Sequence, residues 1–214
     1  MLKSLAKWAF FIYNFIMEKE LIEQNKTTFI MLAKDDIKRE GIDSLLSWLE
    51  TTDFFSAPAS SKYHLSEEGG LCAHSLNVYE RLVRLCESEY GEDGYNKESV
   101  AIIGLFHDLC KTNTYKVEMR NVKEDGVWVQ KPYFTVDDNL PYGHGEKSVY
   151  MLSGFIKLTR EEAMAINWHM GGFDLRVQGG SYDYNKAFNK FPLALLAHLA
   201  DMQATFLDEN QEQN

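Results

Sequence analysis

A histidine–aspartate doublet lies inside a run of apolar residues. His107 and Asp108 belong to the segment 101–111, which reads AIIGLFHDLCK. An imidazole and a carboxylate are costly to bury among apolar side chains unless they are paired or bind a cation. Imidazole and carboxylate together suit borderline and hard divalent ions. The doublet therefore predicts a metal site, and an aspartate that bridges two ions would serve a two-metal centre.

Four further residues have types and surroundings expected of metal ligands. His74 lies on the apolar stripe of a predicted helix, and His144 lies between two glycines, where the backbone can approach a ligand closely. His169 ends a predicted helix, and Asp201 is a carboxylate in an otherwise apolar helix. A lone histidine is most often a satisfied core or surface residue, so each candidate also has a structural explanation. Their number within one chain favours ligation.

Helical patterns dominate the chain and predict the elements that must position these residues. The predicted helices are 35–40, 42–51, 71–89, 97–111, 146–156, 160–169 and 191–207. Thr159, followed by Glu161 and Glu162, is typical of a capped helix start. Loops are expected over 53–68 and, because it is rich in glycine, over 171–180.

One segment alternates polar and apolar residues instead. Residues 115–136 contain two such stretches separated by a turn motif at 123–126, which predicts a β-hairpin inserted between helices. The sequence has no internal repeat. The predicted fold class is therefore all-α, a helical bundle with a small inserted β-hairpin at about 115–136.

The composition limits the partners. The chain has 214 residues, 45% of them hydrophobic, which allows one sizeable core. Its net charge of -10 disfavours non-specific binding to nucleic acid or to an anionic membrane. A small phosphorylated substrate stays compatible, because a metal or a local cation can invert the field within one cleft. The three cysteines form no CxxC motif, which favours a reducing, cytoplasmic environment.

The first 17 residues combine basic and apolar side chains and loosely imitate a signal peptide. No small-x-small cleavage motif follows, and the apolar stretch is too short to span a bilayer. We expect a docking helix, or an extension upstream of a start at Met17, rather than a membrane anchor. The expected organisation is an N-terminal extension and docking helix over 1–34, one domain over 35–207 and a polar tail over 208–214.

The order His74, His107-Asp108 and Asp201 resembles the HD-domain superfamily of metal-dependent phosphohydrolases, which is named after the doublet. The resemblance covers roughly residues 69–205. Its most specific parts are GLCAHSL at 70–76, HDLCK at 107–111, GHGEKS at 143–148 and the pair at 200–201. It implies an HD-type domain within 35–207.

The resemblance also implies the ligands. In that family the first histidine, the doublet and the last aspartate bind a metal, and members with two further histidines before the last aspartate usually hold two. His144 and His169 match those two places, although binuclear members often carry a His-His pair where this chain has His169-Met170. One or two divalent ions per chain (Mn, Fe, Mg, Zn, Ni or Co) are thus implied. The implied ligands are His74, His107, Asp108, His144, His169 and Asp201.

Other residues are assigned roles other than metal binding, each with a structural alternative. Lys111 lies one turn after the doublet, and the resemblance assigns it, with Asp108, to catalysis by stabilising charge in the transition state. A lysine whose stem packs at a helix end is the structural alternative. His198, one turn before Asp201, is expected to orient that carboxylate or to be a core histidine. Solvated residues are common in such loops, but the candidates for substrate binding are His64, Lys62 and Arg120.

The resulting prediction is a divalent-metal-dependent phosphohydrolase that acts on a nucleotide phosphate ester or anhydride through a metal-activated water. A 3′–5′ exoribonuclease-like phosphodiesterase is the nearest alternative, although the acidic chain offers no evident basic RNA channel. A non-catalytic nucleotide-binding HD module is the alternative from another class, and an O₂-activating di-iron oxygenase is a third. The expected partner is a small phosphorylated substrate, with nucleic acid only as a substrate and a homo-oligomer compatible.

Overall fold

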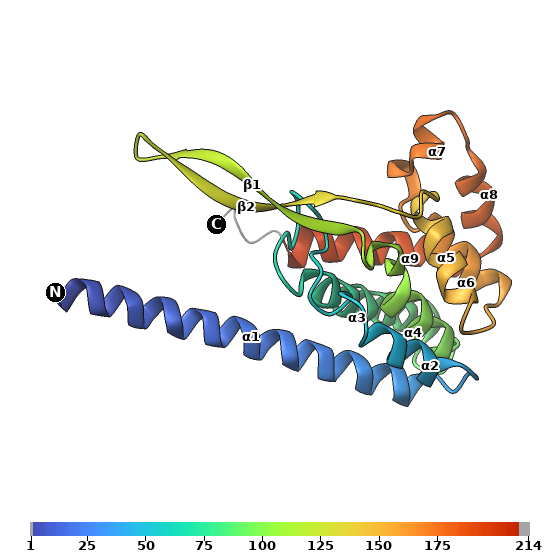
Figure 1. Ribbon diagram of the computed structural model, residues 1–214. Coiled ribbons are helices and arrows are strands. Elements are labelled where there is room, and N and C mark those ends of the chain that lie inside the picture. Colours follow the sequence, from blue (N-terminus) through green and yellow to red (C-terminus); the bar gives the residue numbers. More distant parts are fainter. Residues whose placement is uncertain (1, 210–214) are drawn as a thin grey trace.

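Helices form almost all of the regular structure, and one two-stranded hairpin projects from them (Figure 1). The structure is a computed structural model that describes residues 2–209, with side chains described from residue 18 onward. This architecture confirms the predicted all-α bundle with an inserted hairpin. Among the described residues, no helix combines the length and the apolar composition needed to cross a membrane.

The elements follow one another in the order drawn in Figure 1. They are α1 (Leu2–Asp36), α2 (Ile42–Leu49), α3 (Gly70–Tyr90), α4 (Lys97–Phe106), a 3₁₀ turn (Leu109–Lys111), β1 (Tyr115–Glu124), β2 (Val127–Val136), α5 (His144–Ser153), α6 (Arg160–Trp168), a second 3₁₀ turn (Gly171–Phe173), α7 (Leu175–Gln178), α8 (Asp183–Lys190), α9 (Pro192–Gln203) and a π-helical turn (Ala204–Asp208).

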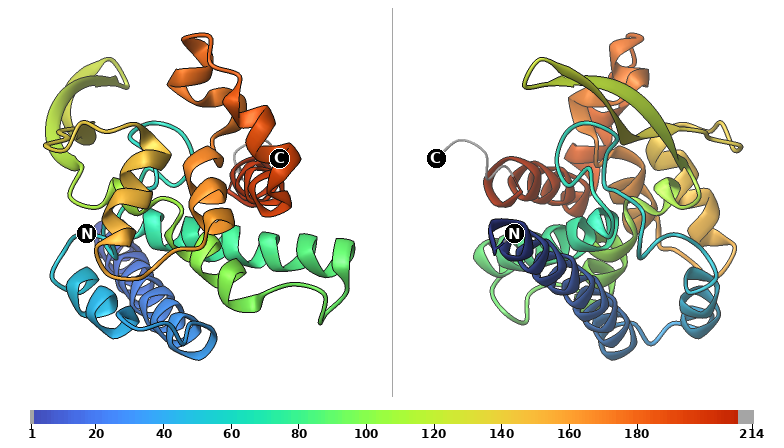
Figure 2. Two further views of the ribbon diagram at one scale, coloured as in Figure 1. Left: turned by 90° about the vertical axis from the view of Figure 1, so that its right-hand side faces the viewer. Right: turned by 60° about the vertical axis from the view of Figure 1, so that its left-hand side comes forward.

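The core lies where α3, α4, α6 and α9 meet, and α4 is buried along nearly its whole length. α3 packs against α4 and α9, and α6 packs against α5 and α9 (Figure 2). At the crossing of α3 and α4 no side chain separates the two backbones. A Cβ atom added to Gly104 would lie 2.6 Å from the Cα atom of Tyr79. This close approach brings the start of α3 next to the end of α4.

A second close approach joins α5 to α6. Gly145 lies in the first turn of α5, and a Cβ atom there would lie 2.3 Å from the carbonyl oxygen of Asn167 and 2.6 Å from that of Ile166. Only glycine fits this contact without a shift of backbone. The start of α5 therefore lies directly against the last carbonyl groups of α6.

The predicted continuous helix over 97–111 is wrong in one respect. α4 ends at Phe106, and the chain resumes as a 3₁₀ turn at Leu109–Lys111. Asp108, between the two, has φ -100° and ψ 20°, outside the helical region. The contacts that its carboxylate makes with charged neighbours outweigh the helical tendency of an apolar run.

Other boundaries differ for local reasons. The short helix predicted over 35–40 is absent, because α1 continues to Asp36 and the chain then turns through Gly41 at φ +96°. The helix predicted over 191–207 begins as α9 at Pro192, a favoured first helical residue, and α8 precedes it over Asp183–Lys190, where no element was predicted. The capped start of α6 at Thr159 is confirmed, with Glu162 completing a capping box.

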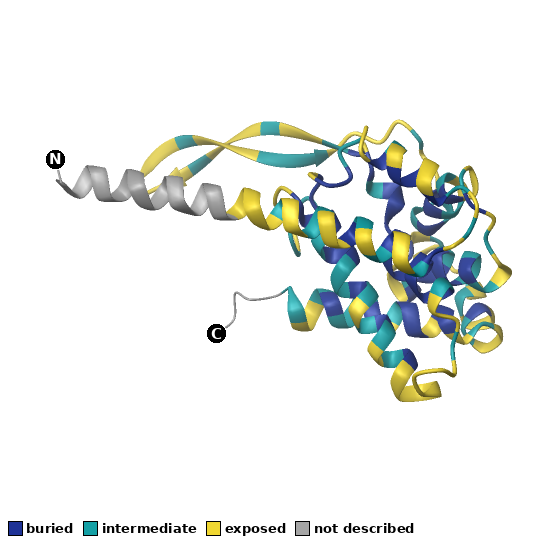
Figure 3. Ribbon diagram, turned by 90° about the horizontal axis from the view of Figure 1, so that it is seen from below, coloured by how far each residue is buried: buried dark blue, intermediate teal, exposed yellow. Residues whose placement is uncertain are grey.

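The hairpin extends away from the core (Figure 3). β1 and β2 pair antiparallel from Tyr115↔Val136 to Glu124↔Val127, and Asp125 and Gly126, both at positive φ, form the turn. The C-terminal part of α1 contributes Phe29, which is fully buried, to the core. The expectations for the side chains of residues 1–17 lie outside the described part.

Candidate metal centre

The six predicted ligands converge on one place in the core. His74 lies in the second turn of α3, His107 ends α4, and Asp108 occupies the break that follows. His144 begins α5, and His169 ends α6. Asp201, from α9, completes the cluster, with its Oδ1 atom 3.3 Å from the Nε2 atom of His74. Four of the six residues are buried, namely His74, His107, Asp108 and His169.

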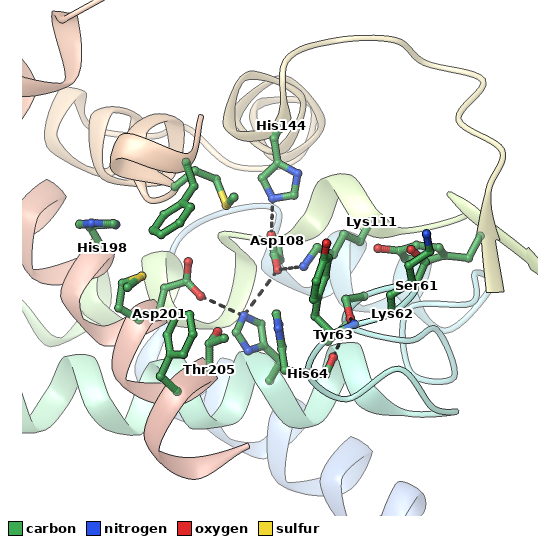
Figure 4. Close-up of a pocket in the computed structure, with 18 residues that line it drawn as sticks. Ser61, Lys62, Tyr63, His64, Asp108, Lys111, His144, His198, Asp201 and Thr205 are labelled. Carbon is green, nitrogen blue, oxygen red and sulfur yellow. Dashed lines mark hydrogen bonds and ion pairs between the residues drawn. The ribbon is translucent and has the colours of Figure 1, made fainter. Parts of the chain in front are cut away.

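The two carboxylate oxygens of Asp108 face different neighbours (Figure 4). Its Oδ2 atom lies 3.6 Å from the Nε2 atoms of both His74 and His107. Its Oδ1 atom lies 2.7 Å from the Nε2 atom of His144 and 3.5 Å from that of His169. Asp108 thus lies between two pairs of histidines, with one oxygen toward each pair.

Three of the histidines are held from outside through Nδ1. The Nδ1 atom of His107 donates to the carbonyl oxygen of Gly104 at 3.0 Å, and that of His169 donates to Ile166 at 2.6 Å. The Nδ1 atom of His74 donates to the carboxylate of Glu209 at 2.9 Å. An imidazole held at Nδ1 by an acceptor turns its Nε2 atom toward the opposite side, which is how metal-binding histidines are commonly oriented.

The Nε2 atoms of three histidines face the interior of the cluster. Those of His74 and His107 lie 3.3 Å apart, and the buried Nε2 atom of His169 has no hydrogen-bond partner among the described residues. A buried ring nitrogen left unpaired is unfavourable. Imidazole nitrogens and carboxylate oxygens in this arrangement fit divalent cations, which accept such lone pairs.

Burial and charge shift the ionisation of the cluster in opposite directions. Burial lowers the pKa of His107 to about 3, so this imidazole is neutral and ready to ligate. Burial would also lower the pKa of His74, but hydrogen bonds to Asp201 and Glu209 outweigh it and raise this pKa to about 9. Lys111 and the neighbouring histidines hold the pKa of Asp108 well below its ordinary value despite burial. A His74 that binds a cation through Nε2 would have to release the proton that this raised pKa favours.

A cavity of about 760 Å³ opens beside the cluster (Figure 4). Ser61, Lys62, Tyr63 and Lys111 lie together beside Asp108 on one side, and Asp201, His198 and Thr205 lie on the other. Residues after α6 and at the end of α9 add apolar surface to the lining. They are Met170, Phe173, Met202 and Phe206. The cavity thus combines cationic and hydroxyl groups with an apolar wall.

The remaining predicted residues are distributed unevenly. Lys111 donates to the Oδ2 atom of Asp108 at 2.6 Å. Lys111, Lys62 and His64 all line the cavity. Arg120 lies outside the described cavity lining, on the hairpin, where its guanidinium lies 5.2 Å from the ring centre of Tyr133.

His198 contacts the end of α6. Its Nδ1 atom donates to the backbone carbonyl of His169 at 2.7 Å, so its hydrogen bond supports the end of α6 rather than Asp201.

Two residues at the cluster were missed. Glu209, assigned to the polar tail, is buried against His74, and the Sγ atom of Cys110 lies 3.4 Å from the Nδ1 atom of His144. Cys110 could have been noticed, because it lies two residues after Asp108 in the same apolar run. Glu209 lies about two helical turns after Asp201, a spacing that fits one helical face, yet its polar surroundings suggested solvent.

Comparison with known proteins identifies the class. The HD domain family matches residues 71–202, which is more than half of the chain. The chain therefore belongs to the HD-domain family. This family is part of a superfamily of metal-dependent hydrolases, and HD domains bind divalent metals. Neither the curated proteins nor the solved structures gave a significant match.

Proposed function

We propose that this protein is a divalent-metal-dependent phosphohydrolase that acts on a nucleotide phosphate ester or anhydride. The observation that carries the proposal is the division of Asp108 between two histidine pairs. One ion would be held by His74, His107, Asp201 and the Oδ2 atom of Asp108. A second would be held by His144, His169 and the Oδ1 atom. Bound there, divalent ions polarise a phosphate oxygen and lower the pKa of a water molecule.

Lys111 has a role of its own in this proposal. Its side chain lines the cavity and is 14% exposed, so a substrate oxygen can reach it. Burial would lower its pKa, but the carboxylate of Asp108 outweighs this and holds the pKa above its ordinary value. The group therefore stays protonated, and it can donate a hydrogen bond to a phosphoryl oxygen as negative charge develops there.

The two sides of the cavity support a nucleotide as substrate. Lys62 and Lys111 supply positive charge for phosphate groups. Phe173 and Phe206, each 54% exposed, are free to contact a planar base on the other side. Stacking of a base on an aromatic side chain contributes about 1–3 kcal/mol. A substrate that joins an aromatic base to a phosphate fits both sides better than a simple phosphate ester does.

Metal content tests the proposal first. Protein purified without chelator should contain about two divalent ions per chain, and a nucleotide screen with that metal should reveal turnover. Asp108→Ala should lose both the ions and the turnover, because both proposed groups of ligands share this carboxylate. A variant that kept full activity would contradict the mechanism. Absence of metal, even after incubation with Mn²⁺, would favour a non-catalytic binding module.

Substrate choice separates the remaining alternatives. Phe206→Ala should raise KM for nucleotides by about 5- to 150-fold, the equivalent of the stacking energy, and leave KM for ribose 5-phosphate unchanged. Faster turnover of short oligonucleotides than of mononucleotides would favour the phosphodiesterase alternative. Iron-rich, coloured protein without phosphohydrolase activity would favour an oxygenase.

A cytoplasmic location is also part of the proposal. All three cysteines are buried and free, which suits a reducing compartment. A homo-oligomer stays compatible with this function. Sedimentation of the purified protein in an analytical ultracentrifuge measures the oligomeric state directly.

A further inference from the structure

The last described residues pack beside the candidate metal centre. Residues 204–209, called the C-terminal strap here, follow α9 as a π-helical turn and end at Glu209. The backbone N–H of Glu209 donates to the carbonyl oxygen of Ala204 at 3.1 Å, the wide spacing of a π turn. Such turns occur frequently at functional sites. The strap packs against α3, the helix that carries His74.

The side chain of Glu209 is buried, and its carboxylate is hydrogen-bonded by residues of α3. Its side chain is 1% exposed, and its carboxylate accepts from the Nδ1 atom of His74 at 2.9 and 3.1 Å. It also accepts from the Nδ2 atom of Asn77 at 2.9 Å. The buried Nε2 atom of His64 lies 3.9 Å from the Oε2 atom of Glu209 and has no hydrogen-bond partner among the described residues. A carboxylate buried this deeply needs such partners to offset its loss of solvation.

Three residues of α3 bind the strap, and their spacing puts them on one helical face. His74, Asn77 and Arg81 lie at positions i, i+3 and i+7. The first two bind Glu209, and the Nε atom of Arg81 donates to Asp208 at 2.8 Å. The strap is thus attached to α3 at two adjacent residues, of which only Glu209 contacts a proposed ligand.

We propose that Glu209 is a positioning residue that holds the imidazole of His74 for the divalent ion, so that the C-terminal strap completes the metal centre. Asp201 and Glu209, from one continuous terminal segment, contact opposite nitrogens of this ring. A carboxylate on Nδ1 fixes the orientation of the ring and increases the basicity of Nε2. The inference rests on the proposed metal site but not on the identity of the substrate.

Metal affinity measured on the full chain tests this role. Glu209→Ala should weaken Mn²⁺ binding by about 10- to 100-fold, measured by competition with a chromophoric chelator, as is typical when such a partner is removed. Glu209→Gln keeps an oxygen that can accept from Nδ1, so its loss should be smaller. Asp208→Asn is the matched control, because it weakens the other attachment of the strap and should change the affinity by less than about twofold.

A second measurement needs no metal. In ¹⁵N-resolved NMR spectra, the Nδ1 proton of His74 should be protected from exchange in the metal-free protein and in Asp208→Asn, and should lose that protection in Glu209→Ala. Unchanged protection and affinity in Glu209→Ala would overturn the inference, as would equal losses in the two strap variants. Protection that depends on Glu209 in a chain that binds no Mn²⁺ would support the contact and contradict the proposed function instead.

Discussion

Two of the clusters in which the described residues bury charge differ in how completely their polar atoms are bonded. In the first, the fully buried carboxylate of Glu162 accepts from Arg39 at 2.6 and 3.1 Å and from the hydroxyl of Ser99 at 2.7 Å. It also accepts from the backbone N–H of Thr159 at 2.7 Å. These bonds join the turn after α1 to α4 and α6.

In the metal centre the balance is reversed. The Nε2 atoms of His74 and His107 face each other, and within the described part of the chain the Nε2 atom of His169 has no hydrogen-bond partner. A fully bonded buried network stabilises and specifies a fold, whereas an incompletely bonded one costs stability. Proteins retain such costs mainly at functional sites. The difference between the clusters therefore distinguishes a group that holds the fold together from one whose composition fits the proposed metal site.

Removal of Arg39 should have the largest effect on folding. Arg39→Ala leaves the carboxylate of Glu162 buried without its cation, which costs about 3–5 kcal/mol of unfolding free energy. Urea denaturation of the metal-free protein measures the loss. Lys186→Ala is the control, because Lys186 pairs with Asp183 at the surface and should change stability by less than about 0.5 kcal/mol. Equal effects of the two variants would refute the structural role of the first cluster.

The stability that the first cluster contributes should decrease as the pH falls. Burial opposes it, but Arg39, Ser99 and the N–H of Thr159 together lower the pKa of Glu162 below its ordinary 4.5. The contribution of Glu162 to folding stability is therefore complete above pH 4.5, the ordinary pKa. It is lost as the pH falls through the lower pKa that Glu162 has in the folded protein. Glu162→Gln should cost about 2 kcal/mol at neutral pH, where a charged hydrogen-bonding group is replaced. It should also reduce the loss of stability between neutral and acidic pH.

Gly145 tests how closely packing and ligation are linked. Gly145→Ala should push against the carbonyl groups at the end of α6 and cost about 1–3 kcal/mol. One of these carbonyls, that of Ile166, holds the Nδ1 atom of His169, so affinity for Mn²⁺ should also fall. Gly172→Ala is the control, because a Cβ atom there meets no neighbour within 4 Å. Unaltered affinity for Mn²⁺ in Gly145→Ala would show that packing at Gly145 does not influence metal binding, contrary to this prediction.

His169 should show the smallest effect on folding and thereby sharpen the comparison. His169→Leu loses one hydrogen bond to Ile166 but also removes the unpaired Nε2 atom. These changes oppose each other, so the metal-free protein should change in stability by less than about 1 kcal/mol. The added stability that Mn²⁺ gives should decrease markedly, because one proposed ion loses a ligand. A large destabilisation without metal would contradict the distinction between the clusters.

The sequence predicted those features that depend on local patterns. The helix of His74, the hairpin and the capping box of Glu162 all follow from residue spacing, and the match of the HD domain family confirms the resemblance. The six proposed ligands do lie together in the structure. Their roles as ligands stay a prediction.

Long-range contacts could not be predicted in this way. The break of α4 at Asp108 depends on partners from three other elements, and the burial of Glu209 depends on the π turn that precedes it. The hydrogen bond of His198 to His169 joins helices that are distant in the chain. None of these partners is visible in the spacing of residues along one segment.

The contact between Gly104 and Tyr79 has a consequence for how this site can change over time. Because the backbones of α3 and α4 touch there, the separation of the two helices is set by the radii of main-chain atoms. Substitutions elsewhere in the core can alter side-chain volume without altering that separation. The backbone contact therefore fixes the distance between the two helices. The distance between His74 and His107 can stay the same during evolution while other core residues are substituted.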